Sequence, residues 1–135
     1  MIGNKETSLP NISRVRLITY WITTGIVALQ VVTGAYLDLS KNTDFSKIAQ
    51  HLGYPVYLLT FLGVLRVLAL IALLAPRFPR LKEWAYAGCF FEYTLALASH
   101  FAVGDGVNAW IWPLIFIGIL MVSWYLRPAS RKLST

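Results

Sequence analysis

Four long apolar runs constrain the fold of this chain more than any other feature of its sequence. They cover residues 17–37, 56–75, 84–103 and 107–126. A helix needs about 20 apolar residues to cross a bilayer, and lipid offers no hydrogen bonds to the backbone. We therefore predict an all-α integral membrane four-helix bundle over residues 17–126, with an N-terminal tail, 1–16, and a C-terminal tail, 127–135.

The composition agrees with a membrane protein. Hydrophobic residues make up 57% of the 135 residues and charged residues only 13%, which is unusual for a soluble domain. The net charge is +6, but the basic residues lie between the apolar runs instead of forming one patch, so nucleic-acid binding is not expected. The single cysteine, Cys89, excludes an internal disulfide or a dithiol relay.

The basic residues also predict an orientation. Nine of them fall in the N-terminal tail, the second loop and the C-terminal tail, whereas the opposite side carries only Lys41 and Lys47. Short loops that are rich in lysine and arginine stay in the cytoplasm. We expect a multi-pass protein with both termini cytoplasmic.

The first loop, residues 38–54, contains a further helical pattern. Asn42 or Thr43 can cap a helix start, and Gly53 followed by Pro55 ends the pattern. The apolar residues between them follow helical spacing: Phe45, Ile48, Ala49 and Leu52. We predict a short amphipathic helix at the extracytoplasmic surface, which serves either as a connector or as a lid over the bundle.

Arg66 is the only charged residue in the second run. An arginine near the bilayer centre costs at least ~2.5–3.5 kcal/mol, so it is rare and usually has a partner. The short loop 76–83 makes the second and third runs a hairpin whose register places Glu92 within about 1–2 Å of the depth of Arg66. We predict an Arg66–Glu92 ion pair inside the bundle, with either a structural or a ligand-binding role.

Further polar residues extend this pair into a candidate ligand-binding set. The set is Arg66, Glu92, His100, Gln30 and Ser99, and it is expected to line a polar cleft that opens to the extracytoplasmic side. No metal site is predicted, because His51 and His100 lie on different elements without ligand spacing. No catalytic residue is assigned, since the sequence contains none of the common nucleophile, phosphate-binding or metalloprotease motifs.

Small residues predict where the helices approach each other closely. Gly63 and Gly88 lie in the hairpin, and Gly25 and Gly34 lie in the first run. Glycine allows two membrane helices to come into backbone contact.

Several segments together resemble the DoxX-like family of small bacterial four-span membrane proteins. They are His51-Leu52-Gly53-Tyr54-Pro55, Leu62-Gly63 with Arg66, residues 76–88, and Ser99-His100 followed by Gly104-Asp105-Gly106. The resemblance implies a four-helix bundle in the bacterial cytoplasmic (inner) membrane, without a settled activity. The wider group includes a membrane subunit of thiosulfate:quinone oxidoreductase and proteins linked to quinone and thiol stress.

The family's basic position in the second span is matched by Arg66, where the family often has lysine. Because arginine stays charged and prefers bidentate pairing, we expect Arg66 to hold a ligand or the fold and not to exchange protons.

These features favour an accessory membrane subunit that binds a small hydrophobic ligand, a quinone or a lipid, and is linked to membrane redox or stress chemistry. Three alternatives remain open: a membrane oxidoreductase subunit, a small transporter and a purely structural membrane protein. The expected partners are the lipid bilayer and either a membrane or redox protein or further copies of this chain.

Overall fold

The computed structural model describes residues 9–133, and within this range the chain forms helices and connecting turns only. The elements are α2 (Leu9–Leu39), α3 (Thr43–His51), α4 (Tyr57–Leu74), α5 (Pro79–Ala102), α6 (Val107–Tyr125) and a short 3-10 helix, η1 (Ala129–Arg131). The prediction of an all-α protein is confirmed for the described residues.

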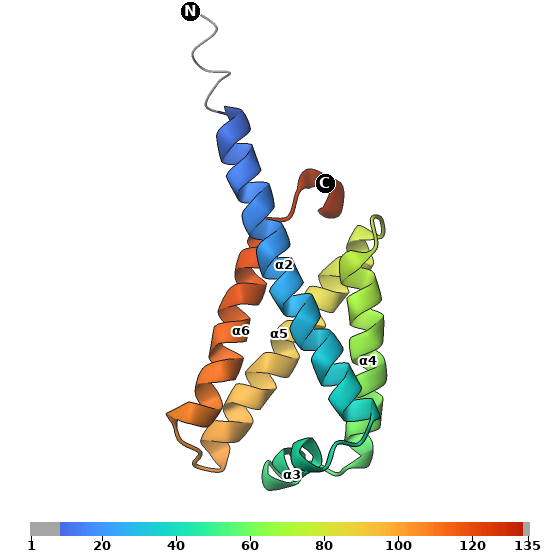
Figure 1. The fold of residues 1–135 in the computed structure, drawn as a ribbon, viewed down its shortest axis with the longest axis vertical. Coiled ribbons are helices and arrows are strands. Elements are labelled where there is room, and N and C mark those ends of the chain that lie inside the picture. The colour runs from blue at the N-terminus through green and yellow to red at the C-terminus, as the bar shows by residue number, and fades with distance from the viewer. Residues whose placement is uncertain (1–8, 134–135) are drawn as a thin grey trace, which may run out of the picture.

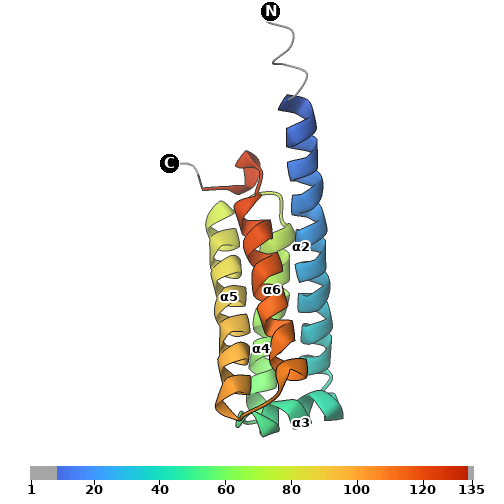
Figure 2. The ribbon, with the colours of Figure 1, turned by 90° about the vertical axis from the view of Figure 1, so that its left-hand side faces the viewer.

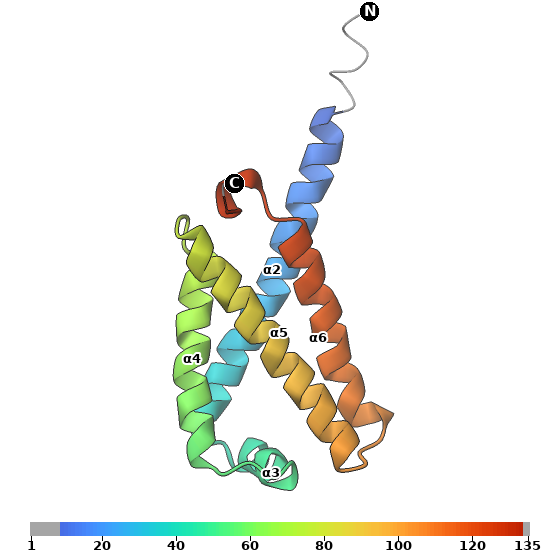
Figure 3. The same ribbon diagram turned by 180° about the vertical axis from the view of Figure 1, so that it is seen from behind.

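The four long helices run along the length of the molecule, and α3 lies across one end of it (Figures 1 and 2). Helix α2 packs against α4 and α6, and α5 packs against the same two helices. Seen from behind, α3 sits between the ends of α4 and α5, far from the N-terminus (Figure 3). We call this the α3 end of the molecule.

A compact set of apolar side chains fills the centre of this assembly. It comprises Val27, Val31, Leu73, Ala85, Tyr86, Cys89, Tyr93 and Leu120. The outer faces are apolar as well, since large side chains such as Leu29, Phe61 and Leu68 are exposed there. An apolar exterior over long helices is what a lipid environment requires.

Among the described residues, three helices are long and apolar enough to cross a membrane, namely Ser13–Leu39, Tyr57–Leu74 and Val107–Tyr125. They contain the predicted run 17–37 and most of the runs 56–75 and 107–126. The remaining predicted run, 84–103, falls in α5 except for its last residue. Helix α5 carries four charged residues, Arg80, Lys82, Glu83 and Glu92, and is not among the three.

A helix occupies the first loop where the sequence pattern places one. Helix α3 begins at Thr43, and the side-chain oxygen of Asn42 accepts a hydrogen bond from the Phe45 backbone N–H at 3.1 Å. The helix ends at His51, and Gly53 follows with a φ of +91°, a left-handed conformation that suits glycine.

Both predicted tails include ordered structure. Helix α2 already begins at Leu9, inside the predicted tail 1–16. At the other end, Arg131 is buried and donates from Nη1 to the Leu73 carbonyl at 2.9 Å and from Nη2 to the Leu74 carbonyl at 3.3 Å. Arg131, in the predicted C-terminal tail, therefore caps the last carbonyls of α4, which have no partners within the helix.

The glycine predictions divide evenly. A Cβ on Gly34 would lie 2.9 Å from Arg66 Cζ, and one on Gly63 would lie 2.7 Å from Leu39 Cγ, so these two close approaches are confirmed. The prediction is wrong for Gly25 and Gly88, because a Cβ there meets nothing within 4 Å.

Candidate ligand site at the Arg66 charge cluster

Arg66 lies inside the molecule and faces α5. Its Nε donates to Glu92 Oε1 at 2.8 Å, and Nη2 donates to the same oxygen. The predicted Arg66–Glu92 ion pair is therefore present. The short turn between α4 and α5 sets this register, as expected for two antiparallel helices joined by few residues.

Asp38 is a second acidic partner that the sequence reasoning missed. Arg66 Nη1 donates to Asp38 Oδ2 at 2.8 Å. Asp38 had been assigned to the first loop, but it belongs to the last turn of α2. The Arg66 side chain points back toward the start of α4, as helical side chains do, and α2 ends at that level. The guanidinium group of arginine carries enough N–H donors for two carboxylates, and this could have suggested a search for a second acidic partner of Arg66.

These three side chains form what we call the charge cluster: Asp38, Arg66 and Glu92. Their side chains are 0%, 12% and 24% exposed, respectively. The guanidinium also lies over the Phe45 ring, with Cζ 6.0 Å from the ring centroid. Arg66 is thus held from three helices, α2, α3 and α5.

A cavity of about 520 Å³ adjoins the charge cluster. Most of its wall is apolar or aromatic, and α3 contributes Phe45, Ile48 and Ala49 to it. The wall also includes Gly88 of α5 and Pro113 of α6. A cavity of this size and character is typical of small-molecule sites, which range from about 300 to 1,000 Å³.

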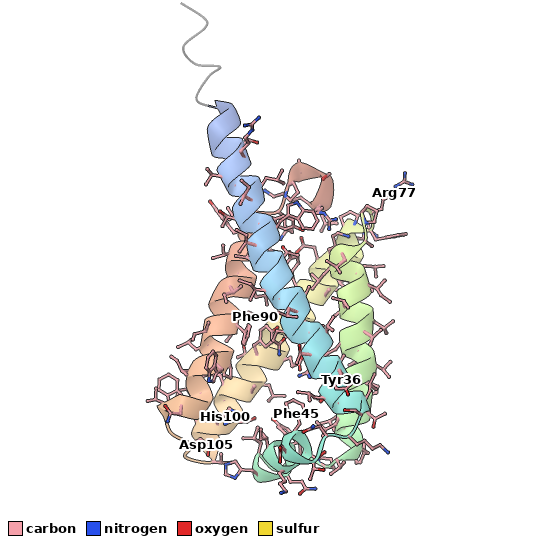
Figure 4. The ribbon with its side chains drawn as sticks, in the orientation of Figure 1. Tyr36, Phe45, Arg77, Phe90, His100 and Asp105 are labelled. Carbon is pink, nitrogen blue, oxygen red and sulfur yellow. The ribbon has the colours of Figure 1, made fainter. Side chains whose placement is uncertain are left out.

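Two histidines meet one carboxylate at the α3 end. His100 Nδ1 lies 2.6 Å from Asp105 Oδ2, and His51 Nε2 lies 2.7 Å from Asp105 Oδ1. Figure 4 shows His100 beside Asp105, with Phe45 of α3 nearby. The hydrogen bond from His100, then that from His51, holds the pKa of Asp105 below its ordinary value. Sequence reasoning placed the two histidines on separate elements and missed that Asp105 joins them.

The other predicted residues divide between the cavity wall and its surroundings. Gln30 lines the cavity, and its Oε1 accepts a hydrogen bond from Tyr93 at 2.6 Å. His100 lines the cavity too, as do Arg66 and Glu92. Ser99 is not part of the cavity wall. Its hydroxyl oxygen lies 2.5 Å from the hydroxyl oxygen of Tyr54, and Tyr54 does line the cavity.

The contacts of Asp105 and Ser99 have a common effect. They join α3 and the segment after it to the α5–α6 end, across one side of the cavity. Among the described residues, no three histidine, cysteine or acidic side chains are arranged to hold a metal ion. The features of the cavity that can recognise a ligand are its shape, its aromatic surface and the charge cluster.

The family model of the DoxX-like family matches residues 22–123 of this chain. The match includes the four long helices in large part, the charge cluster and the residues that line the cavity. No curated protein and no solved structure shows a significant match.

Proposed function

This chain belongs to the DoxX-like family of membrane proteins, and on that premise we propose that it binds a small hydrophobic ligand within the bilayer. The ligand occupies the cavity of about 520 Å³ beside the charge cluster. That cavity is the observation that carries the proposal, because an apolar space with a few converging polar groups is what ligand sites share.

The proposal includes a topology. Helix α5 crosses the membrane as well, so that α2, α4, α5 and α6 are the four spans, and the charge of Glu92 is balanced by Arg66. The basic residues of the N-terminal region, the α4–α5 turn and the C-terminal region face the cytoplasm of a bacterial inner membrane. Helix α3 then lies at the extracytoplasmic interface with its apolar face over the cavity.

In this arrangement the protein acts as an accessory, ligand-holding subunit linked to membrane redox or stress chemistry. A quinone or a lipid is the expected ligand, because each has an apolar body. A purely structural role for the charge cluster is the alternative that most needs separating, since ionic groups inside a membrane also pair to lower their own cost.

Filling the cavity tests the proposal. Gly88 lines the cavity, and a Cβ there meets nothing within 4 Å, so Gly88→Leu adds a side chain at the cavity wall. Gly118→Leu on α6 is the matched control, because Gly118 also has open space but does not line the cavity.

The readout is quenching of tryptophan fluorescence by a decyl-chain benzoquinone in neutral-lipid nanodiscs, with Trp112 in the cavity wall as a reporter. We expect saturable quenching in the wild type and in Gly118→Leu, and loss of the saturable part in Gly88→Leu. Identical quenching curves for the two variants would contradict the proposal and favour the structural role.

A further inference from the structure

The charge cluster contains more negative than positive groups. Asp38 and Glu92 are both acidic, and Arg66 is the only lysine or arginine that the described part of the chain contributes to the cavity wall. With all three groups ionised, the cluster carries one negative charge in excess. An uncompensated charge away from water is costly, so the cluster favours an additional positive charge.

The hydrogen bonding of the charge cluster also lacks donors. Among the described residues, Asp38 Oδ1 is buried and accepts no hydrogen bond. Asp38 lines the cavity, and its other oxygen is already occupied by Arg66. Glu92 Oε1 accepts two hydrogen bonds from Arg66, and neither of them reaches Oε2. The missing partner is therefore a donor and not an acceptor.

The remainder of the wall suits a cation with an apolar body. Phe45, Phe91, Trp112 and Phe116 line the cavity together with aliphatic side chains. Aromatic faces attract a positive charge, most strongly where water is excluded. The carbonyl oxygens of a quinone, by contrast, only accept hydrogen bonds and carry no charge.

We propose that the cavity selects apolar molecules with a protonated amine head, whose N–H groups bind the free Oε2 of Glu92 while the alkyl or aromatic body fills the aromatic-lined space. This inference rests on the proposed function, because it specifies the ligand of the same cavity. It narrows the ligand class from hydrophobic molecules in general to lipophilic amines, and it disfavours a neutral quinone as the preferred ligand.

A series of ligands with one chain length tests the inference on the wild-type protein. Decylamine, decyltrimethylammonium and decanol are compared as competitors of the decyl-chain benzoquinone in the fluorescence assay at pH 7. We expect decylamine to compete at a concentration at least about tenfold lower than decanol, because its charge pairs with the excess carboxylate. Decyltrimethylammonium has the charge but no N–H donor and should fall between the two.

The same competition assay on the Asp38→Asn variant provides a second test. This substitution removes the excess charge, so the advantage of decylamine over decanol should disappear. Retention of that advantage would show that the excess negative charge of the cluster does not attract the amine and would overturn the inference, as would equal competition by decanol and decylamine in the wild type. If Asp38→Asn does not fold, the ligand series on the wild type still decides.

The two proposals fail in different ways. Saturable binding that is lost in Gly88→Leu but shows no preference for the amine overturns only the inference. Absence of saturable binding for every compound overturns the proposed function itself.

Discussion

Gly34→Ala is the sharpest test of how the charge cluster is built. A methyl group at residue 34 would lie 2.9 Å from Arg66 Cζ, closer than real contacts allow, and 3.3 Å from Arg66 Nε, which is a tight contact. A free arginine would swing away at small cost. Here the guanidinium is held between Asp38 and Glu92, so it can move only by loosening those ion pairs.

The magnitude follows from that restraint. Breaking a buried ion pair costs about 3–5 kcal/mol, and the better helix propensity of alanine returns up to about 1 kcal/mol. We expect the free energy of unfolding to fall by about 2–4 kcal/mol.

The assay is reversible unfolding in mixed micelles with increasing dodecyl sulfate, followed by circular dichroism. Gly25→Ala is the matched control, because it makes the same change in the same helix where a Cβ meets nothing within 4 Å. The control should stay within about 1 kcal/mol of the wild type. Equal stabilities of the two variants would refute the close fit of Arg66 against α2.

Three further predictions concern other polar contacts. Lys82→Met removes an ammonium that donates to three main-chain carbonyls near the end of α4, so the same unfolding assay should show a loss of about 2–3 kcal/mol. Ser123→Ala removes the common partner of Thr24 and Tyr86 and should cost about 1 kcal/mol in that assay, whereas an unchanged stability would contradict the network. The lowered pKa of Asp105 means that its contribution to stability is present above the ordinary value of 3.8 and is lost as the pH falls through the lower folded-state value. The stability difference between wild type and Asp105→Asn should therefore shrink as the pH falls below 3.8, and a difference that persists at pH 2 would argue against this contact.

The sequence could predict those features that are determined by residues close together in the chain. The Arg66–Glu92 pair was predictable because the two helices are joined by a short turn, which leaves little freedom in their alignment. The start and end of α3 were predictable because Asn42 and Gly53 are local capping signals. In each case the deciding residues are close in sequence to the feature that they determine.

The contact between Asp38 and Arg66 was not predicted, because it joins residues that are far apart in the chain. The contact depends on how α2 and α4 align, and the connection between them contains α3, whose direction no local pattern fixes. The same connection carries His51 to Asp105. Arg131 reaches α4 from the far end of the chain, a distance over which sequence spacing has no predictive value.

Gly88 shows how a correct observation can receive the wrong interpretation. A small residue in a predicted span suggests close helix packing, but the same residue serves equally to leave space for a ligand. The structure gives open space at Gly88 and contact at Gly34, although the two glycines look alike in sequence. Only the arrangement of the neighbouring helices distinguishes them.

The central claim is that the cavity beside the charge cluster holds a ligand, and native mass spectrometry of the protein released gently from its own membranes tests this most directly. The account predicts a small-molecule adduct on the wild type and on Gly118→Leu that is absent from Gly88→Leu. The mass of the adduct would also identify whether it carries an amine. A wild-type protein that is free of adducts, or adducts that persist equally in Gly88→Leu, would contradict the account.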